Sequence, residues 1–239
     1  MKTNIKIGIV AIVALLCGQV VNAQKKHDLT VKLSHPSKPG VLNADLFTGS
    51  VKITGYAGNE VVITSSLPND PDKISTAEKD NIVKLKVEQP TVVDFTIMVP
   101  RNFSVVLKIL AAGNVTIDNL TGDQDIAISA GDVTMTNIDG SVSVNTKKGN
   151  VTVDMAPKMM NNAITLSNVQ GIISLTIPTT QKANVKLQTE FAKVTSDFEI
   201  EKPSADQPSN KHIEGKINGG GSEILMRSVG GSIYLRKKK

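Results

Sequence analysis

Five aspartates in one short stretch of the chain come nearest, by type and spacing, to catalytic chemistry: Asp118, Asp123, Asp125, Asp132 and Asp139. Paired carboxylates roughly 5 to 9 Å apart hydrolyse glycosides, one acting as acid and the other as base or nucleophile. If the chain coils as a β-helix, two of these aspartates from adjacent coils could reach that separation. A polysaccharide-acting enzyme is therefore one function to weigh.

Turn formation gives Asp123 and Asp132 a simpler role. Each follows a glycine, and Asp and Asn favour turns because their side chains bond to nearby backbone. Asn114 and Asn150 occupy the equivalent position in related strings, and an amide cannot act as an acid or a base. The sequence therefore assigns no catalytic residues and disfavours an enzyme.

The spacing of the three histidines is not typical of metal ligands. His27, His35 and His212 form no H-x-x-x-H or H-E-x-x-H pair, and we expect them to be exposed and without partners. Calcium-binding solenoids repeat G-G-x-G-x-D every nine residues, whereas this chain has one glycine per nine. We therefore expect no metal site, and no motif indicates a cofactor.

The N-terminus has the pattern of a secretory signal peptide over residues 1–23. Lys2 and Lys6 precede an apolar run from Ile7 to Leu16, and small residues end at Ala23. The only cysteine, Cys17, lies inside this segment, so the expected mature domain, residues 24–239, has no thiol chemistry or disulfides. We expect export to the periplasm, the cell surface or the medium, with no transmembrane segment in the mature chain.

The composition indicates a folded chain with few rings. Hydrophobic residues make up 40% of it and aromatic residues 3%, which argues against disorder and a coiled coil and predicts a ring-free interior. Single-strand nucleic-acid grooves depend on aromatic stacking, so no nucleic-acid partner is expected. The net charge is +5, or +3 without Lys2 and Lys6. We interpret the basic run from Arg236 to Lys239 as protection of an edge strand.

Glycines recur every nine residues through the middle of the chain: Gly113, Gly122, Gly131, Gly140 and Gly149. The first, third and fifth open three similar strings, GNVTI, GDVTM and GNVTV, which lie eighteen residues apart. Apolar residues alternate with threonines in each string, which is the two-residue period of a half-buried strand. Thr116, Thr134 and Thr152 should therefore face outward, and Val115, Val133 and Val151 should form one internal column.

Two all-β architectures fit this period. The favoured one is a single-domain, right-handed β-solenoid with coils of about 18 residues, because the closest likeness is at eighteen residues rather than nine. The alternative is an antiparallel β-meander or sandwich. The segments Leu67 to Asn81 and Glu201 to His212 are predicted to be loops that interrupt one continuous domain.

Three segments carry a family resemblance: Gly49 to Ile63, Gly113 to Val153, and Gly215 to Leu235. The first reads G-S-V-x-I-x-G-x-x-G-x-E-V-x-I, the second repeats G-[DN]-V-x-[IVM], and the third contains I-N-G-G-G. Together they resemble the bacterial putative-adhesin domain family of unknown function. The resemblance implies an exported β-solenoid-like protein with an adhesive or envelope role, and it brings no catalytic residues.

The leading functional hypothesis is therefore a non-enzymatic exported protein that binds through a flat polar face. Thr116, Thr134 and Thr152 are the candidate binding residues, and an unknown protein or a surface polysaccharide is the expected partner. The alternative hypothesis is a periplasmic envelope scaffold or accessory protein without adhesion. The same threonines could also serve only to stabilise their strands.

Overall fold

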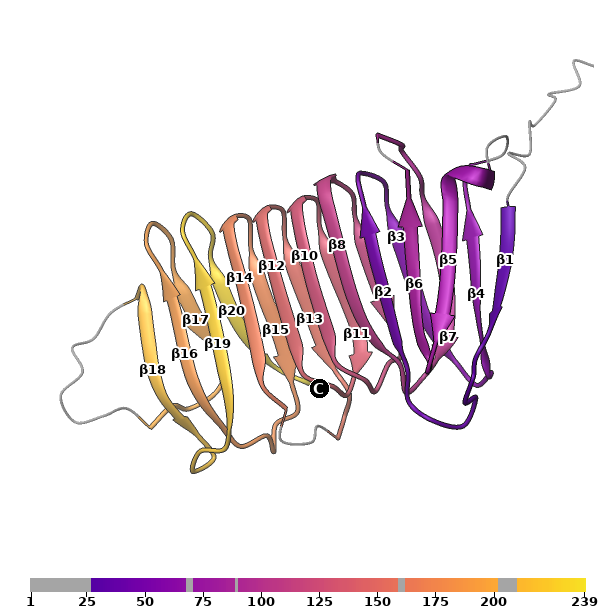
Figure 1. Ribbon diagram of the computed structural model, residues 1–239. Coiled ribbons are helices and arrows are strands. Elements are labelled where there is room, and N and C mark those ends of the chain that lie inside the picture. Colours follow the sequence, from indigo (N-terminus) through magenta and orange to yellow (C-terminus); the bar gives the residue numbers. More distant parts are fainter. Residues whose placement is uncertain (1–26, 68–70, 89, 159–161, 202–209) are drawn as a thin grey trace, which may run out of the picture.

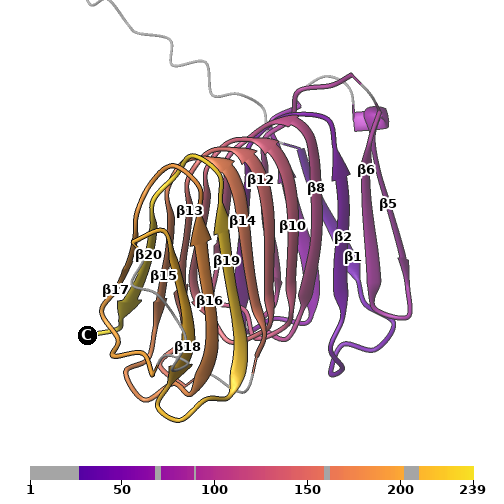
Figure 2. The ribbon, with the colours of Figure 1, turned by 90° about the vertical axis from the view of Figure 1, so that its left-hand side faces the viewer.

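The computed structural model describes residues 27–67, 71–88, 90–158, 162–201 and 210–239. The expected signal peptide, including Cys17, lies outside these ranges. The strands form two ten-stranded sheets that face each other (Figures 1 and 2). Sheet A runs, in spatial order, β1 (His27–Lys32), β4 (Glu60–Ser65), β7 (Phe95–Pro100), β3 (Val51–Tyr56), β9 (Val115–Asp118), β11 (Val133–Ile138), β13 (Val151–Met155), β15 (Ile173–Ile177), β20 (Ile233–Lys237) and β17 (Val194–Ser196).

Sheet B forms the opposite layer. It runs β18 (His212–Ile217), β16 (Ala183–Thr189), β19 (Ser222–Ser228), β14 (Ile164–Gln170), β12 (Val142–Lys148), β10 (Gln124–Ala130), β8 (Ser104–Ala112), β2 (Val41–Leu46), β6 (Ile82–Val87) and β5 (Ile74–Lys79). Each central coil crosses once from sheet B to sheet A and returns. In Figure 1 the chain rises in the near sheet, descends behind it and advances leftward, which is a right-handed coil.

The predicted 18-residue coil is confirmed in the middle of the chain. Strands β9, β11 and β13 pair in parallel, with Val115 opposite Val133 and Val133 opposite Val151. These valines are buried, as the alternation predicted. Because the pairing is parallel, the antiparallel meander does not describe this part of the chain.

The order of coils in space differs from their order in the sequence. Strands β2 and β3 lie between β6–β7 and β8–β9, and β19 and β20 lie between β14–β15 and β16–β17. Val51 therefore pairs directly with Val115, and Ile173 pairs with Ile233. The outlying G-x-V repeats continue the central column, while the intervening segments fold into the coils at the two ends.

The ends of the solenoid differ from its middle in strand direction. At one end β1, β4 and β7 pair antiparallel, and so do β5 and β6; at the other end β18 pairs antiparallel with β16. The prediction of a loop from Leu67 to Asn81 was wrong in part, because η1 (Pro71–Lys73) and β5 lie within it. Strand β5 forms the edge of sheet B, and its alternate residues Ser75, Ala77 and Lys79 are exposed.

Close stacking of the coils explains the glycine period. A Cβ on Gly131 would lie 2.1 Å from the carbonyl oxygen of Gly113, and a Cβ on Gly140 would lie 1.9 Å from that of Gly122. Gly131 also has a φ of +129°, which other L-residues rarely adopt. The glycines at these corners are therefore required by the approach of one coil to the next, as well as by local turn shape.

The expectation of a ring-free interior was wrong. The core contains rings, because Phe95, Phe103 and Phe198 are buried at or near the ends of the central stack. Strand β20, which carries the basic run, is paired on both sides by β15 and β17. The pairing with β17 ends at Leu235, so Arg236 and Lys237 pair with β15 alone.

One row of the interior is polar. Thr146, Asn168, Ser228 and Thr189 are buried neighbours on successive strands of sheet B. Asn168 Nδ2 donates to the carbonyl of Gly171 at 2.9 Å, and Thr189 Oγ1 donates to that of Gly231 at 2.8 Å. These two side chains donate hydrogen bonds to backbone carbonyls of the corner glycines, which would otherwise be buried without a partner. No helix within the described ranges is long and apolar enough to cross a membrane.

Candidate functional site

The three candidate threonines form a straight ladder on the outer face of sheet A. Thr134 lies opposite Thr116 on one side and Thr152 on the other, and all three side chains are exposed. Neighbouring strands are about 4.8 Å apart, so the hydroxyls repeat at that interval along the solenoid. The predicted outward orientation and alignment of these residues are confirmed.

The ladder continues beyond the three threonines in both directions. Lys52 on β3 pairs with Thr116, and Ser174 on β15 pairs with Thr152. Tyr234 on β20 follows Ser174, and the guanidinium of Arg236 lies 4.8 Å from its ring centroid. This extension has no signal in the sequence repeat, because the pairing partners lie outside the regular 18-residue period.

A second outward row lies beside the ladder, two residues further along each strand. Thr136 pairs with Asp118 and with Asp154. The carboxylate of Asp154 accepts a hydrogen bond from Lys238 Nζ at 2.6 Å, and the same amine donates to the carbonyl of Met155 at 2.7 Å. Lys238 near the C-terminus thus binds the end of β13. The outer face of sheet A presents hydroxyl groups between charged side chains that lie apart from one another.

The Asn and Asp residues after the glycines connect successive coils. The backbone N–H of Asp132 donates to Oδ1 of Asn114 at 3.0 Å, and the N–H of Ile172 donates to Oδ1 of Asn150 at 2.9 Å. At the other corner the N–H of Ser141 donates to Oδ1 of Asp123 at 2.8 Å. Their structural role is therefore observed, and it explains why both Asn and Asp occur at this position, since each supplies an Oδ1 acceptor.

The structure does not bring the two corner aspartates together. Asp123 precedes β10 and Asp132 follows it, so they lie at opposite corners of a coil. Seven strand residues separate them, which is about 20 Å at roughly 3.3 Å per residue. Asp118 faces outward from sheet A and Asp125 from sheet B. Asp132 therefore lies apart from the other aspartates, because the two turns of a coil are on opposite edges. Asp139 is at the same edge as Asp123, where its backbone N–H donates to the carbonyl of Leu120 one coil earlier.

One of the histidines, His212, differs from the expectation. His212 begins strand β18 rather than lying in a loop, and its Nε2 lies 3.4 Å from Oε2 of Glu214. His35 is exposed, but its backbone N–H and carbonyl bond to the amide side chain of Asn81. His27 lies on β1. Within the described ranges, no three His, Cys, Asp or Glu side chains are grouped to hold a metal ion.

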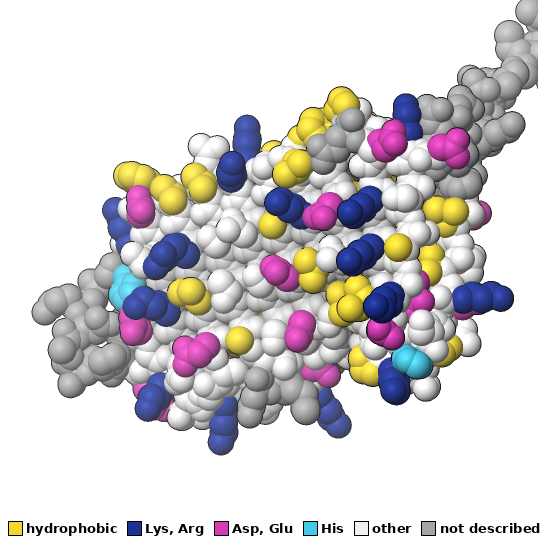
Figure 3. All heavy atoms as spheres, viewed as in Figure 1, with side chains coloured by type: hydrophobic (Ala, Val, Ile, Leu, Met, Phe, Trp, Pro, Cys, Tyr) yellow, Lys and Arg dark blue, Asp and Glu magenta, His cyan; other side chains and the backbone are white. Residues whose placement is uncertain are grey.

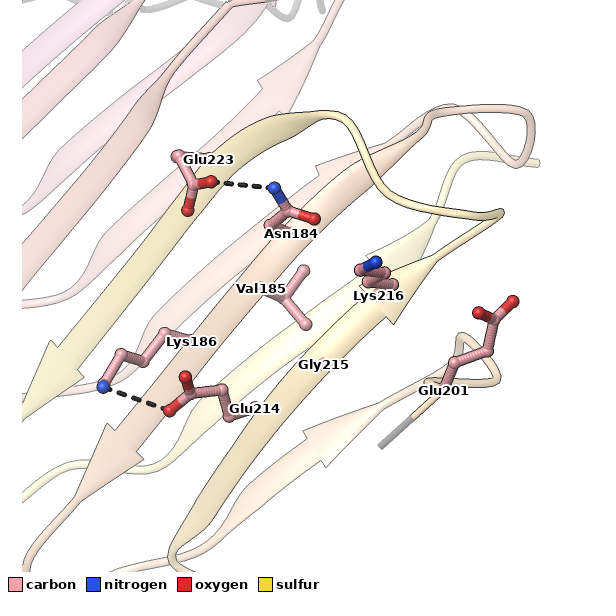
Figure 4. A pocket seen from close by; sticks show the side chains of 8 residues that line it. All are labelled: Asn184, Val185, Lys186, Glu201, Glu214, Gly215, Lys216 and Glu223. Atoms are coloured by element: carbon pink, nitrogen blue, oxygen red, sulfur yellow. Dashed lines mark hydrogen bonds and ion pairs between the residues drawn. The ribbon is translucent and has the colours of Figure 1, made fainter. Parts of the chain in front are cut away.

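A polar hollow of about 560 Å³ lies over β16, β18 and β19 (Figure 4). Lys186 Nζ contacts Glu214 Oε2 at 3.0 Å, and Asn184 Nδ2 donates to Glu223 Oε1 at 2.8 Å. The hydrogen bond from Lys186, followed by its charge, lowers the pKa of Glu214. A carboxylate stabilised in its charged form is poorly suited to act as a general acid, and the hollow is broad and open, with charges of both signs.

The family model described as Toastrack DUF4097 matches residues 104–236. This match covers more than half of the chain, which therefore belongs to the Toastrack DUF4097 family. The resemblance stated from the glycine and strand motifs is thus confirmed at the level of the family. No curated protein matches the chain.

Solved structures of bacterial proteins have a similar architecture. A crystal structure described as a putative cell adhesion protein from Clostridium sporogenes has a TM-score of 0.58 and 14% identity, covering 90% of this chain and 99% of that one. A structure described as a putative adhesin from Bacteroides fragilis has a TM-score of 0.48 and 16% identity, covering 89% and 98%. At this identity the first similarity supports a shared fold.

Proposed function

We propose that the chain is an exported, non-enzymatic protein of the bacterial envelope, which binds a surface polysaccharide or a protein partner through the outer face of sheet A. The observation that carries this proposal is the in-register alignment of Thr116, Thr134 and Thr152. Each hydroxyl can donate and accept a hydrogen bond. A row of them at a fixed spacing offers a flat, repeating set of contacts to an extended partner.

Export is supported by the sequence of residues 1–23, which has the charge, apolar run and small residues of a signal peptide. The descriptions of the Clostridium sporogenes and Bacteroides fragilis proteins as adhesins agree with an envelope location. The structural role of Asp123 and Asp132, together with their separation, is consistent with a protein that does not catalyse glycoside cleavage.

The test is a binding assay with the purified secreted form, residues 24–239, on intact cells and on isolated envelope. The variant Thr116→Lys/Thr134→Lys/Thr152→Lys should lose binding, because three long cations replace the hydroxyl ladder. The matched control Ser143→Lys/Asn145→Lys/Ser167→Lys adds the same charge to the outer face of sheet B, and it should bind as the parent does. Equal binding by both variants would place the contact elsewhere.

A periplasmic scaffold without adhesion is the second candidate. The same threonines make cross-strand pairs on neighbouring strands, and such pairs stabilise a sheet without any ligand. Cell fractionation distinguishes the two functions. Retention in the periplasm would exclude direct adhesion, whereas cleavage by protease added to intact cells would exclude a purely periplasmic role.

A further inference from the structure

We propose that the outer face of sheet B at its N-terminal end docks on an anionic phospholipid surface. This basic face consists of the outward side chains of β6, β2 and β8, and Figure 3 shows lysines gathered over these strands with hydrophobic side chains between them. Its principal members are Lys84, Lys86, Lys108, Ile82, Val106 and Leu110. It lies on the layer opposite the threonine ladder, so this inference is independent of the proposed function.

Strand register sets the lysines in a compact array. Lys86 and Lys108 flank Asp45 on the intervening strand, and Lys84 lies beside Asn43. Neighbouring strands are about 4.8 Å apart, so the cations of one row are roughly 10 Å from each other. Asp45 is the only carboxylate on the outer face of these three strands.

The three lysines are available to a ligand. Ion pairs among the described residues involve Lys186, His212 and Lys238, and none involves Lys84, Lys86 or Lys108. On the outer face of the next three strands, β10, β12 and β14, the negative charge of Asp125 offsets the positive charge of Lys147. The outer face of β6, β2 and β8 therefore carries more net positive charge than that of these three strands, and an anion is the complementary partner.

Exposed apolar side chains favour a lipid surface over a soluble polyanion. Ile82, Val106 and Leu110 are 43%, 38% and 46% exposed. A polyanion would pair with the lysines and leave these groups in water. A membrane interface buries apolar groups at the headgroup boundary, while anionic headgroups attract each nearby lysine. Long lysine stems can lie along the apolar groups and keep their amines at the phosphates.

The test uses residues 24–239 and sedimentation with vesicles of equal parts phosphatidylglycerol and phosphatidylcholine. The parent should bind these vesicles, bind less as salt rises, and not bind pure phosphatidylcholine. Lys84→Gln/Lys86→Gln/Lys108→Gln should weaken binding at least tenfold. The matched control Lys147→Gln/Lys148→Gln/Lys193→Gln removes three exposed lysines elsewhere and should stay within twofold of the parent.

A second variant, Ile82→Thr/Val106→Thr, keeps strand propensity and separates the apolar contribution from the charge. It should weaken vesicle binding while the salt dependence remains. Melting curves equal to that of the parent would establish that the variants fold. Failure to bind the anionic vesicles, or equal loss in the two lysine variants, would overturn the proposal. Lysine-dependent binding to dextran sulfate without vesicle binding would also overturn it in favour of a polyanion.

Discussion

The backbone N–H of Asn150 donates a hydrogen bond of 2.7 Å to Oδ1 of Asp132, its equivalent one coil earlier. Asp132, whose carboxylate is of a type that can act as a catalytic acid or base, thus accepts a hydrogen bond that joins two coils. Asp132→Ala should lower the free energy of unfolding by about 1 kcal/mol, because the N–H of Asn150 loses its partner. Asp132→Asn keeps an acceptor oxygen and should be nearly neutral. Urea unfolding measures both, and an equal loss in the two variants would mean that the charge itself matters.

Gly131 is a second position where one coil limits the next. Gly131→Ala should lower the free energy of unfolding by about 3 kcal/mol or more, and Gly131→Val by at least as much, because a Cβ meets the carbonyl of Gly113 and the positive φ is strained. Gly230→Ala is the matched control, since its Cβ would have 3.4 Å to its nearest neighbour. A near-neutral Gly131→Ala would contradict the stacking explanation of the period.

Truncation of two adjacent residues on β9 should lower the free energy of unfolding by very different amounts. Ile117 is fully buried and Thr116 is exposed. Ile117→Ala should therefore cost about 2 to 5 kcal/mol of the free energy of unfolding, while Thr116→Ala should cost less than about 1 kcal/mol. Denaturant melts measure both values. A larger loss for Thr116→Ala would place the strand in the opposite register.

The contact between Lys186 and Glu214 makes a prediction about pH. The pKa of Glu214 lies below its ordinary value, chiefly because Lys186 donates a hydrogen bond to it. Lys186→Met should raise that pKa, which a ¹³C NMR titration of the side-chain carboxyl can follow. Lys216→Met, a neighbour across the hollow, should change it less. An unaltered pKa in Lys186→Met would assign the effect to another group.

The sign of the linkage follows from the lowered pKa of Glu214. A carboxyl group whose folded-state pKa is lowered stabilises the fold above its unfolded-state pKa, and this contribution is lost as the pH falls through the folded-state pKa. Because the pair is exposed to solvent, screening keeps the contribution small. The free energies of unfolding of the parent and of Lys186→Met should therefore differ slightly at neutral pH and converge as the pH falls below the ordinary pKa of glutamate.

Local repetition made the central coils predictable. Gly113, Gly131 and Gly149 mark equivalent corners, and the alternation around Thr134 fixed which face is buried, since both depend on neighbours a few residues away. Such patterns contain no information about which distant strand completes a pairing. Gly113 stacks on Gly49, although several strands lie between them in the sequence. This spatial order depends on how whole coils fit together in three dimensions.

The candidate site was predictable to the same extent. The alignment of Thr116, Thr134 and Thr152 follows from the 18-residue period. The extension of the ladder to Lys52 depends on the insertion of one coil between two others. The contact between Lys238 and Asp154 depends on the position of the C-terminal strand β20 between β15 and β17. Neither contact has a local sequence signal, because each joins segments far apart in the chain.

The central claim, that the outer face of sheet A is the binding surface, can be tested by cysteine protection. Residues 24–239 contain no cysteine, so Thr134→Cys and the control Asn145→Cys each provide one exposed thiol on opposite sheets. The rate of maleimide labelling should fall for Thr134→Cys when purified envelope is added, and it should not change for Asn145→Cys. Equal rates with and without envelope for Thr134→Cys, at concentrations where the protein is bound, would contradict the claim.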